Sequence, residues 1–427
     1  MEIKKLHKLF LSSSGTATDT RKIQKNSIFF ALKGANFDAN TFAQQALLQG
    51  AAFVVIDDKN YYLNEATILV DDVLETLQTL ANYHRNFLKI PIIAITGSNG
   101  KTTSKELMCA VLSKKFNTKA TVGNLNNHIG VPLTLLSFDK NTQIGIVEMG
   151  ANHQKEIEFL CNLAEPDYGY ITNFGKAHLE GFGGFQGVIK GKSELFNYLK
   201  INHKIIFINE DDPIQIEKIS DIENFGYSSY RNEAFLKIDS ISANPFLKVG
   251  FDDTIIQSHL IGIYNANNIA IAVLVGKFFE IPNFDIKQAI EDYIPENNRS
   301  QMLIKNSNEI ILDAYNANPS SMKVAIENFC QIQNQNKIVF LGDMFELGAE
   351  SYFEHQQIVT SLIGDQNITC YFVGKYFFEC QNEMSHFKFF ESFDALKENL
   401  SATKIQNNVI LIKGSRGMAL ERILDCI

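Results

Sequence analysis

Short apolar runs alternate along most of this chain with segments whose apolar residues recur at helical spacing. A continuous apolar run of four to eight residues is typical of a buried strand, and a 3.6-residue spacing is typical of a helix. In the middle of the chain, strands and helices are predicted in strict alternation over residues 90–95, 104–116, 143–148, 154–163, 168–172, 185–199 and 204–209. This order is typical of βαβ units built around a mostly parallel sheet.

The pattern changes after this alternating stretch. Residues 235–260 read as antiparallel strands appended to the central sheet, and helical spacing returns over 265–279 and 285–293. From residue 299 onward the alternation starts again, which indicates a separate, smaller doubly wound domain. The strands expected there lie at residues 310–313, 337–341, 371–373 and 408–412.

The first part of the chain carries weaker signals. Strand patterns at 27–31, 53–56 and 68–70 precede a helical pattern over 73–87. A chain of 427 residues is long for one domain, so two or three are expected. We therefore predict an α/β protein of three domains, with boundaries at 1–87, 88–298 and 299–427.

Composition narrows the function classes. The net charge of −9 gives no general surface for nucleic acid or for an anionic membrane, and an anionic substrate would need a local basic pocket. No apolar run reaches bilayer length, and the amino terminus does not read as a signal peptide. The six cysteines are scattered without a C-x-x-C pair, which favours free thiols in a reducing compartment. We expect a cytoplasmic protein that is not inserted in a membrane.

The most informative motif is ITGSNGKTT at residues 95–103, between a predicted strand and a predicted helix. Backbone N–H groups of such a turn and the positive end of the helix dipole bind phosphate. In a P-loop the lysine, here Lys101, contacts the β- and γ-phosphates, and the hydroxyl, here Thr102, suits Mg²⁺. The loop is shorter than the usual pattern, because Ile95 stands where the first glycine would be. Alone, this match favours nucleotide binding over an ordinary turn by about two to one.

Three reactive side chains follow later strands, where the carboxyl ends of a parallel sheet gather ligands. Glu148 ends an apolar run, and a carboxylate there can hold a Mg²⁺ that bridges the phosphates. His178 follows the strand expected at 168–172, although a lone loop histidine is more often structural. From its chemistry alone Lys192 would be an exposed helical lysine.

Several asparagine-rich loops stand before expected helices: 123–136, 262–268 and 313–322. Each is compatible with simple turn and cap chemistry, and Asn265 and Asn268 could instead read a base edge. In the last domain, DAYNANPSSM at 313–322, LGDMFELG at 341–348 and KGSRGM at 413–418 all follow strands. Three such loops in one domain indicate a domain that closes on a ligand.

Together these residues resemble the Mur ligase family over nearly the whole chain. TDTR at 18–21 and IFFALKGANFDAN at 28–40 are similar to its uridine-nucleotide-binding domain. ITGSNGKTT, NNHIGVP, EMGANH and ITNFGKAHLE are similar to its central ATPase domain. DAYNANPSSM and LGDMFELG are similar to signatures of one member of the family rather than of its sister ligases, and the KGSR loop is family-like. The resemblance implies a small α/β amino-terminal domain, a central parallel-sheet P-loop ATPase domain and a Rossmann-like last domain.

The resemblance also implies roles for matching positions. Lys101 and Thr102 would hold the ATP phosphates and a first Mg²⁺ with Glu148, while His178 and a carbamylated Lys192 would hold a second Mg²⁺. Catalysis would depend on Lys101, His178 and Lys192. The implied ATP-binding residues are Gly97, Ser98, Asn99, Gly100, Lys101, Thr102, Thr103, Asn268, Arg299 and Asp313. The implied substrate-binding residues are Thr20, Arg21, Asn127, Lys413 and Arg416.

The chain departs from the family pattern at two of these sites. Family members often carry D-G-H where this chain has Asp38, Ala39 and Asn40, and R-H-N where it has Ile263, Tyr264 and Asn265. The contacts to uridine and the stacking on adenine are therefore expected to differ from the family pattern.

The implied reaction joins D-alanyl-D-alanine to the free carboxylate of UDP-N-acetylmuramoyl-tripeptide, with ATP activating that carboxylate as an acyl phosphate. A monomer is expected. Alternatives are another Mur-type ligase, a folylpolyglutamate synthase-like ligase, a non-catalytic nucleotide-binding partner and a P-loop kinase. The third residue of the tripeptide and the tolerance for other dipeptides are not given by the sequence.

Overall fold

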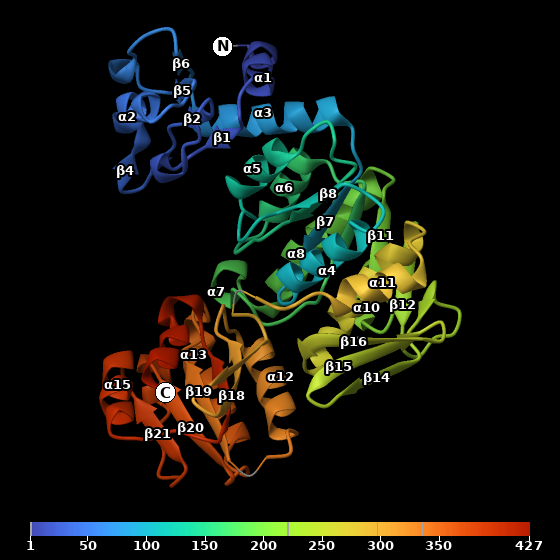
Figure 1. The fold of residues 1–427 in the computed structure, drawn as a ribbon, viewed down its shortest axis with the longest axis vertical. Coiled ribbons are helices and arrows are strands. Elements are labelled where there is room, and N and C mark those ends of the chain that lie inside the picture. Colours follow the sequence, from blue (N-terminus) through green and yellow to red (C-terminus); the bar gives the residue numbers. More distant parts are fainter. Residues whose placement is uncertain (1, 220–221, 297, 335) are drawn as a thin grey trace.

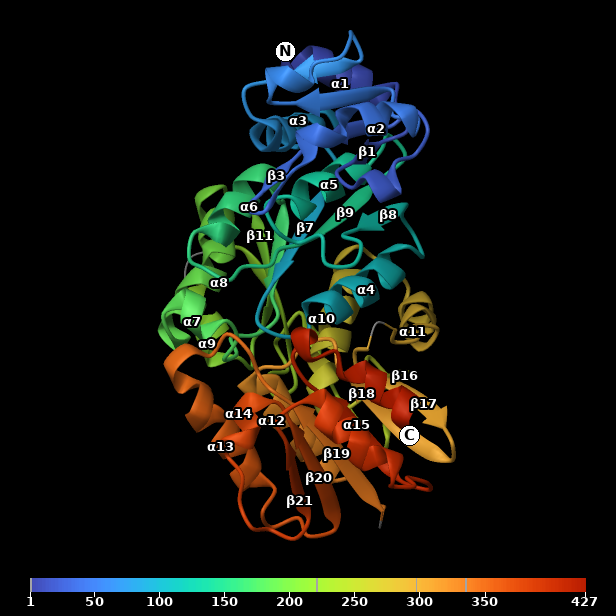
Figure 2. The same cartoon turned by 90° about the vertical axis from the view of Figure 1, so that its left-hand side faces the viewer.

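The computed structural model describes residues 2–219, 222–296, 298–334 and 336–427. Three sheet-centred units follow one another along the long axis of the molecule (Figure 1). The amino-terminal unit lies at one end, the carboxyl-terminal unit at the other, and the largest lies between them, as the turned view also shows (Figure 2). The predicted three-domain α/β architecture is therefore confirmed.

The amino-terminal unit is built on the parallel sheet β1-β2-β5-β6. Ala43 and Ala46 of α2 pack on one face of this sheet. Leu6 of α1 and Leu77 and Leu80 of α3 pack on the other face. Its elements are α1 (Ile3–Leu11), β1 (Thr16–Ala17), β2 (Ile28–Phe30), β3 (Lys33–Gly34), β4 (Phe37–Asp38), α2 (Ala43–Leu48), β5 (Phe53–Ile56), β6 (Thr67–Leu69) and α3 (Val73–Leu88).

The central unit is a seven-stranded parallel sheet in the order β13-β12-β11-β10-β7-β9-β8. Successive side chains of a strand point to opposite faces, so Ile92 and Ala94 pack with α3, α5, α6 and α8, whereas Ile93 and Ile95 pack with α4 and α10. Its elements are β7 (Ile92–Thr96), α4 (Lys101–Leu112), β8 (Thr118–Ala120), α5 (Gly130–Ser137), β9 (Ile144–Glu148), α6 (Glu156–Ala164), β10 (Tyr168–Ile171), α7 (Leu179–Phe182), α8 (Phe185–Ile201), β11 (Ile205–Asn209), α9 (Pro213–Lys218), β12 (Asn224–Ser228) and β13 (Leu236–Lys237), followed by β14 (Ser240–Ala243), β15 (Phe246–Phe251), β16 (Thr254–Ile261), α10 (Ala266–Phe278) and α11 (Asn283–Glu291).

The prediction for residues 235–260 needs one correction. Strands β14, β15 and β16 are antiparallel, as expected, but they form a separate three-stranded sheet that packs against α10. The start of this segment, β13, instead extends the parallel sheet beside β12. The change of direction occurs where Asp239 turns the chain out of the sheet edge, with its N–H donating to the carbonyl of Gly250.

The carboxyl-terminal unit holds the sheet β17-β18-β22-β19-β20-β21, which is parallel except for β17. Helices cover both of its faces, as a doubly wound fold requires. Its elements are β17 (Gln301–Lys305), β18 (Asn308–Asp313), α12 (Pro319–Cys330), β19 (Lys337–Gly342), α13 (Ser351–Ser361), β20 (Ile368–Val373), α14 (Lys375–Phe378), β21 (Phe387–Phe390), α15 (Phe393–Ser401) and β22 (Val409–Lys413).

The strand order of the central sheet places the functional loops. The chain leaves β7 for the edge strand β8, returns to β9 on one side of β7 and then crosses to β10 on its other side. A crevice forms outside the carboxyl ends of strands where the direction of winding switches in this way. The loops after β7, β9 and β10 therefore meet, and they face the carboxyl-terminal unit. No helix in the described ranges is both long enough and apolar enough to cross a membrane.

Candidate active site

The loop between β7 and α4 has the backbone shape of a phosphate-binding turn. Gly97 and Gly100 adopt φ of 139° and 80°, in the region that favours glycine. A β-carbon at Gly97 would lie 2.0 Å from Thr172 Oγ1, and one at Gly100 would lie 2.5 Å from Asn268 Oδ1. Only glycine fits at both positions, so the loop stays tight and α4 begins at Lys101 with its N–H groups toward the cleft.

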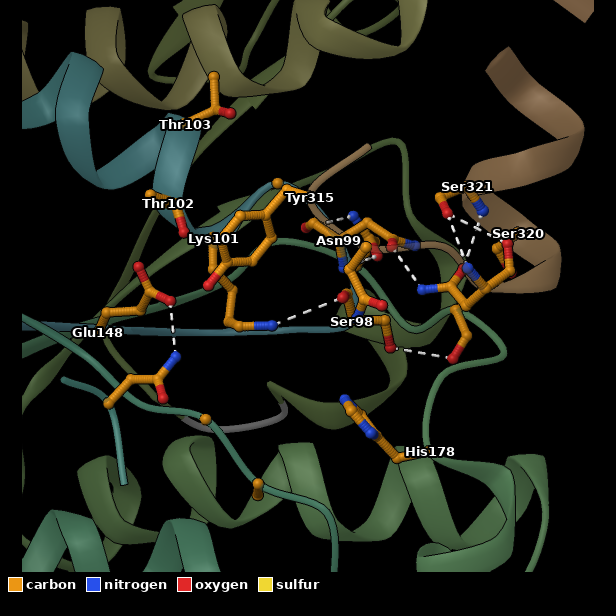
Figure 3. Close-up of a pocket in the computed structure, with 18 of the residues that line it drawn as sticks. Ser98, Asn99, Lys101, Thr102, Thr103, Glu148, His178, Tyr315, Ser320 and Ser321 are labelled. Carbon is orange, nitrogen blue, oxygen red and sulfur yellow. Dashed lines mark hydrogen bonds between the residues drawn. The ribbon is translucent and has the colours of Figure 1, made fainter. Parts of the chain in front are cut away.

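Lys101 folds back along this loop. Its Nζ donates to the carbonyl of Gly97 at 2.7 Å, and the side chain reaches across the pocket toward Ser98 (Figure 3). Burial lowers the pKa of Lys101, the nearby Arg299 lowers it further, and Glu148 opposes both effects. Two carbonyl oxygens are weak partners for an ammonium, so an anion in the cleft would be a stronger one.

Glu148 ends β9 and is only 2% exposed. Asn126 donates to its Oε1 at 2.9 Å, and the Nζ of the equally buried Lys105 lies 3.7 Å from its Oε2. Oε2 has no hydrogen-bond partner among the described residues. An unsatisfied buried carboxylate oxygen is costly, and near the Thr102 hydroxyl at the start of α4 it suits a hard cation such as Mg²⁺. The residues present therefore fit the ion that the fold family implies, with further oxygen ligands left to nucleotide and water.

Lys192 lies inside α8 and is 1% exposed, so the prediction of an exposed lysine from its chemistry alone is wrong. Its Nζ donates to the carbonyl of Ala151 at 3.2 Å and lies 5.1 Å from the Phe182 ring centroid. Burial lowers the pKa of Lys192 well below its usual value, and the charge of Lys101 lowers it further. A neutral amine is the form that reacts with CO₂, so this environment fits a carbamate.

His178 is the N-cap residue just before the short helix α7 and has a left-handed conformation, with φ of 54°. Its ring points into the pocket from the side opposite Ser98 and Lys101 (Figure 3). Its Nδ1 donates to Oε2 of Glu346, which lies in the LGDMFELG loop of the carboxyl-terminal unit. This hydrogen bond lowers the pKa of Glu346. The two units are thus joined beside the cleft.

Further polar contacts hold the carboxyl-terminal unit against the P-loop and against the loop after β10. Asn318 caps α12 by accepting from the N–H of Ser321, and its Nδ2 donates to Oδ1 of Asn99 at 2.7 Å. Lys176 pairs with Glu354 of α13 at 2.5 Å. Asn318 of the 313–322 loop is therefore both a helix cap and an interdomain contact.

The nucleotide side of the cleft combines both units. The guanidinium of Arg299 lies 3.6 Å from the Tyr315 ring centroid, and its Nε has no hydrogen-bond partner among the described residues. Asp313 ends β18 and pairs with the buried Lys413 at 2.6 Å. Asn268 accepts from Ser104 at 2.8 Å and donates to Asn265 at 2.7 Å.

These loops enclose a cleft of about 1010 Å³, large enough for a nucleotide and part of a second substrate. Asn127 is in its wall, but its carboxamide oxygen accepts from the N–H groups of Ile129 and Gly130 and so caps α5. The predicted site residues that line the cleft are Ser98, Asn99, Gly100, Lys101, Thr102, Thr103, Asn127, Glu148, His178, Asn268, Arg299, Asp313 and Lys413.

Other predicted site residues lie elsewhere. Gly97 and Lys192 lie just behind the wall, in contact with Lys101 and Ala151 respectively. Arg416 pairs with Glu421 at 2.8 Å, with its guanidinium 5.9 Å from the Tyr315 ring centroid. Thr20 and Arg21 belong to the amino-terminal unit, where the Arg21 side chain is 87% exposed and pairs with Asp19.

Sequence reasoning missed several residues that the structure brings to the site. Asn126, not only its neighbour Asn127, reaches Glu148, and Lys105 supplies a buried cation beside it. Glu346 and Asn318 were visible as members of motifs, but their partners lie in another domain. Lys105 is the second lysine of the P-loop helix, one turn after Lys101, and this spacing is the local signal that could have indicated it.

A glycine-rich turn on a parallel sheet, facing a doubly wound unit across a polar cleft, defines a P-loop nucleotide-binding protein. A family model described as the Mur ligase middle domain matches residues 95–276, and the Mur ligase glutamate ligase domain matches residues 298–416. The chain belongs to the Mur ligase family. The family's ATP-dependent ligase chemistry accounts for the cleft just described.

Individual relatives cover almost the whole chain. UDP-N-acetylmuramoyl-tripeptide–D-alanyl-D-alanine ligase of Bacillus subtilis is 35% identical, over 96% of this chain and 92% of its own length. The enzyme of the same name from Escherichia coli is 31% identical over 98% and 94%. The crystal structure of MurF from Acinetobacter baumannii superposes with a TM-score of 0.84 at 27% identity, covering 98% of this chain and 97% of that one. A MurF ligase from Thermotoga maritima in complex with ADP shares the fold, with a TM-score of 0.84 at 24% identity.

Proposed function

We propose that this protein uses ATP to join D-alanyl-D-alanine to the tripeptide carboxylate of UDP-N-acetylmuramoyl-tripeptide, giving the pentapeptide precursor of peptidoglycan. The names of the relatives at 31–35% identity support this reaction. The observation that carries it is the cleft itself, where Lys101, His178 and Arg299 face one space lined by both units. The proposal includes a monomer, a cytoplasmic location and the three domain boundaries predicted from the sequence.

The chain's own groups suit an acyl phosphate route. The tripeptide carboxylate attacks the γ-phosphorus of ATP, ADP leaves, and the dipeptide amine then attacks the acyl carbon and releases phosphate. Attack of one anion on another needs positive charge, and Lys101 offers it from a loop that already holds its ammonium. The contacts of Asn318 and Lys176 keep the carboxyl-terminal unit over the cleft, which would exclude water from the acyl phosphate.

Thr102 and Glu148 would hold a first Mg²⁺, and His178 with a carbamylated Lys192 would hold a second. When bound, these ions would supply charge neutralisation at the phosphates and at the substrate carboxylate. Arg299, Asp313 and Asn268 would contact the nucleoside. Thr20, Arg21, Asn127, Lys413 and Arg416 would contact the other substrates.

The test is a product assay. Purified protein with ATP, Mg²⁺ and the UDP-linked tripeptide should release ADP and phosphate only when D-alanyl-D-alanine is added, and mass spectrometry should find the pentapeptide. A stably phosphorylated product would indicate a kinase. Phosphate release that does not depend on the dipeptide would overturn the proposal. Competing tripeptides ending in lysine or a diamino acid in the same assay would identify the third residue.

Lys101→Ala tests the catalytic role of the P-loop lysine in this assay. Loss of the ammonium should lower kcat about 10³-fold, the size seen when one electrostatic contact to a transition state is removed. The fold should persist, because the hydrogen bonds of Lys101 to described residues go only to carbonyls of its own loop. A circular dichroism melt within about 2 °C of the parent would show that only chemistry was lost.

A further inference from the structure

Glu346 stands out because the ligase chemistry described so far gives it no role. It lies in the loop after β19, in the carboxyl-terminal unit, and its carboxylate contacts His178 of the central unit. The carboxylate is about half exposed, at 53%, whereas the His178 side chain is 23% exposed. Glu346 does not line the cleft, so it lies behind the histidine ring as seen from the substrate side.

The backbone on both sides of this contact is unusual. His178 and Glu346 have φ of 54° and 63°, a left-handed conformation that costs free energy for residues with a β-carbon. The N–H of Glu180 donates to the carbonyl of Glu346 at 3.2 Å, so main chain and side chain are joined at the same place. Two strained residues that face each other across a domain interface indicate a geometry that the surrounding structure enforces.

The hydrogen bond shows which ring nitrogen of His178 carries a proton. An ionised carboxylate can only accept, so Nδ1 of His178 carries the proton. In the neutral ring, Nε2 then holds the lone pair, and it has no hydrogen-bond partner among the described residues. Histidines that bind metals commonly donate their other ring N–H to a carboxylate, which fixes the tautomer and the ring orientation.

We propose that Glu346 is a positioning residue for His178: it holds the Nδ1–H tautomer and presents Nε2 to the second metal ion. This inference rests on the proposed function, because that function gives His178 its metal. Since Glu346 belongs to the carboxyl-terminal unit, the metal site is complete only while that unit lies against the central one. The LGDMFELG loop thereby couples domain closure to metal binding.

Direct metal binding tests this without relying on turnover. Mn²⁺, a paramagnetic substitute for Mg²⁺, is titrated into the full chain with a non-hydrolysable ATP analogue and followed by electron paramagnetic resonance. Glu346→Ala should weaken the affinity of one Mn²⁺ about tenfold or more, the usual cost of removing such an outer partner. Glu346→Gln, which keeps a hydrogen-bond acceptor, should recover part of it. Glu350→Ala removes an exposed carboxylate from the same loop and should leave the titration unchanged.

The tautomer gives a second readout on the metal-free chain. In protein labelled with ¹⁵N-histidine, the His178 signals are assigned by their loss in His178→Gln. In the neutral ring, the parent should show a protonated Nδ1 and a bare Nε2, and Glu346→Ala should shift the ring to a tautomer mixture.

An unchanged Mn²⁺ titration together with an unchanged ring spectrum in Glu346→Ala would overturn the inference. So would lost turnover with unchanged Mn²⁺ affinity, since that result would make Glu346 a closure contact alone. If the parent binds two Mn²⁺ ions but makes no pentapeptide, the proposed function fails. The Mn²⁺ affinities of the parent and of Glu346→Ala would still decide whether Glu346 positions His178.

Discussion

The cleft and the amino-terminal unit place their polar residues in opposite ways. In and just behind the cleft wall, Glu148 and Lys192 are almost fully buried and held by neighbours before any ligand arrives. In the amino-terminal unit, the candidate contact Arg21 extends into solvent and its guanidinium pairs with a residue two positions away.

Chemistry requires groups that are fixed in advance, because reorganising them would add to the barrier. Recognition of a long substrate does not require side chains that are fixed in advance, since the bound ligand itself can order exposed side chains. Changes at these buried groups should therefore alter both kcat and stability, and changes in the amino-terminal unit should alter KM.

The largest effect is expected at Lys192. Lys192→Met keeps the apolar stem but removes the amine that a carbamate needs, so kcat should fall about 10³-fold or more. The same change should raise the free energy of unfolding by about 1–2 kcal/mol at neutral pH, because a buried ionisable group is replaced by an apolar one. Partial rescue of Lys192→Ala by a short carboxylic acid would support the carbamate, and full activity of either variant would contradict the role.

The lowered pKa of Lys192 predicts how the free energy of unfolding changes with pH. Its pKa is lowered in the folded chain, so between that value and the unfolded value the unfolded chain binds a proton that the folded chain does not. Stability should therefore rise with pH across this window, and Lys192→Met should flatten the rise. Urea unfolding in CO₂-depleted buffer from about pH 6 to about pH 9 measures it.

The next effect is at the buried pair of Lys105 and Glu148. Lys105→Met removes the cation 3.7 Å from Oε2 and leaves a buried carboxylate with Asn126 as its partner. The free energy of unfolding without metal should fall by about 3 kcal/mol. Adding Glu148→Gln to Lys105→Met should recover much of this loss, and Mg²⁺ should stabilise Lys105→Met more than the parent. Simple additivity of the two substitutions in urea unfolding would show that the pair does not interact.

The fold was readable from the sequence where apolar runs are strong, and less so elsewhere. The strands at 92–96 and 144–148 were predicted within two residues because they are continuous apolar runs in a parallel sheet. Strands such as β8 (Thr118–Ala120) and β17 (Gln301–Lys305) were missed, because their residues are polar or mixed and their pairing partners supply most of the signal.

The candidate site divides in the same way. The P-loop was predicted because its glycines, lysine and hydroxyl lie within one short segment, so local geometry suffices. Lys192 was expected in solvent because a lysine on a helix gives no sign of what packs over it. The partners of Asn318 and Glu346 are 219 and 168 residues away, and only the closed arrangement of two units reveals them.

A smaller effect is expected at Asn318. Asn318→Asp keeps the oxygen that caps α12 but removes the amide that donates to Asn99. The melting temperature should stay near that of the parent, while kcat/KM for ATP should fall about tenfold through the lost hydrogen bond. Asn318→Ala loses the cap as well and should also destabilise the chain by about 1 kcal/mol. If both variants lost activity and stability together, the contact with the P-loop would have no role separate from the cap.

The smallest effect is expected at Arg21, and it bears most directly on the contrast between the two regions. Arg21→Ala removes an exposed guanidinium whose present partner is Asp19, so stability should be unchanged. If Arg21 contacts the anionic end of the UDP-linked substrate, KM for that substrate should rise about threefold to tenfold while kcat stays constant, because an interaction made equally in ground and transition states is lost. Lys22→Ala, one position further along the same exposed turn, is the matched control. A fall in kcat with unchanged KM would mean that the amino-terminal unit also positions the reacting carboxylate, and the division between recognition and chemistry would not hold.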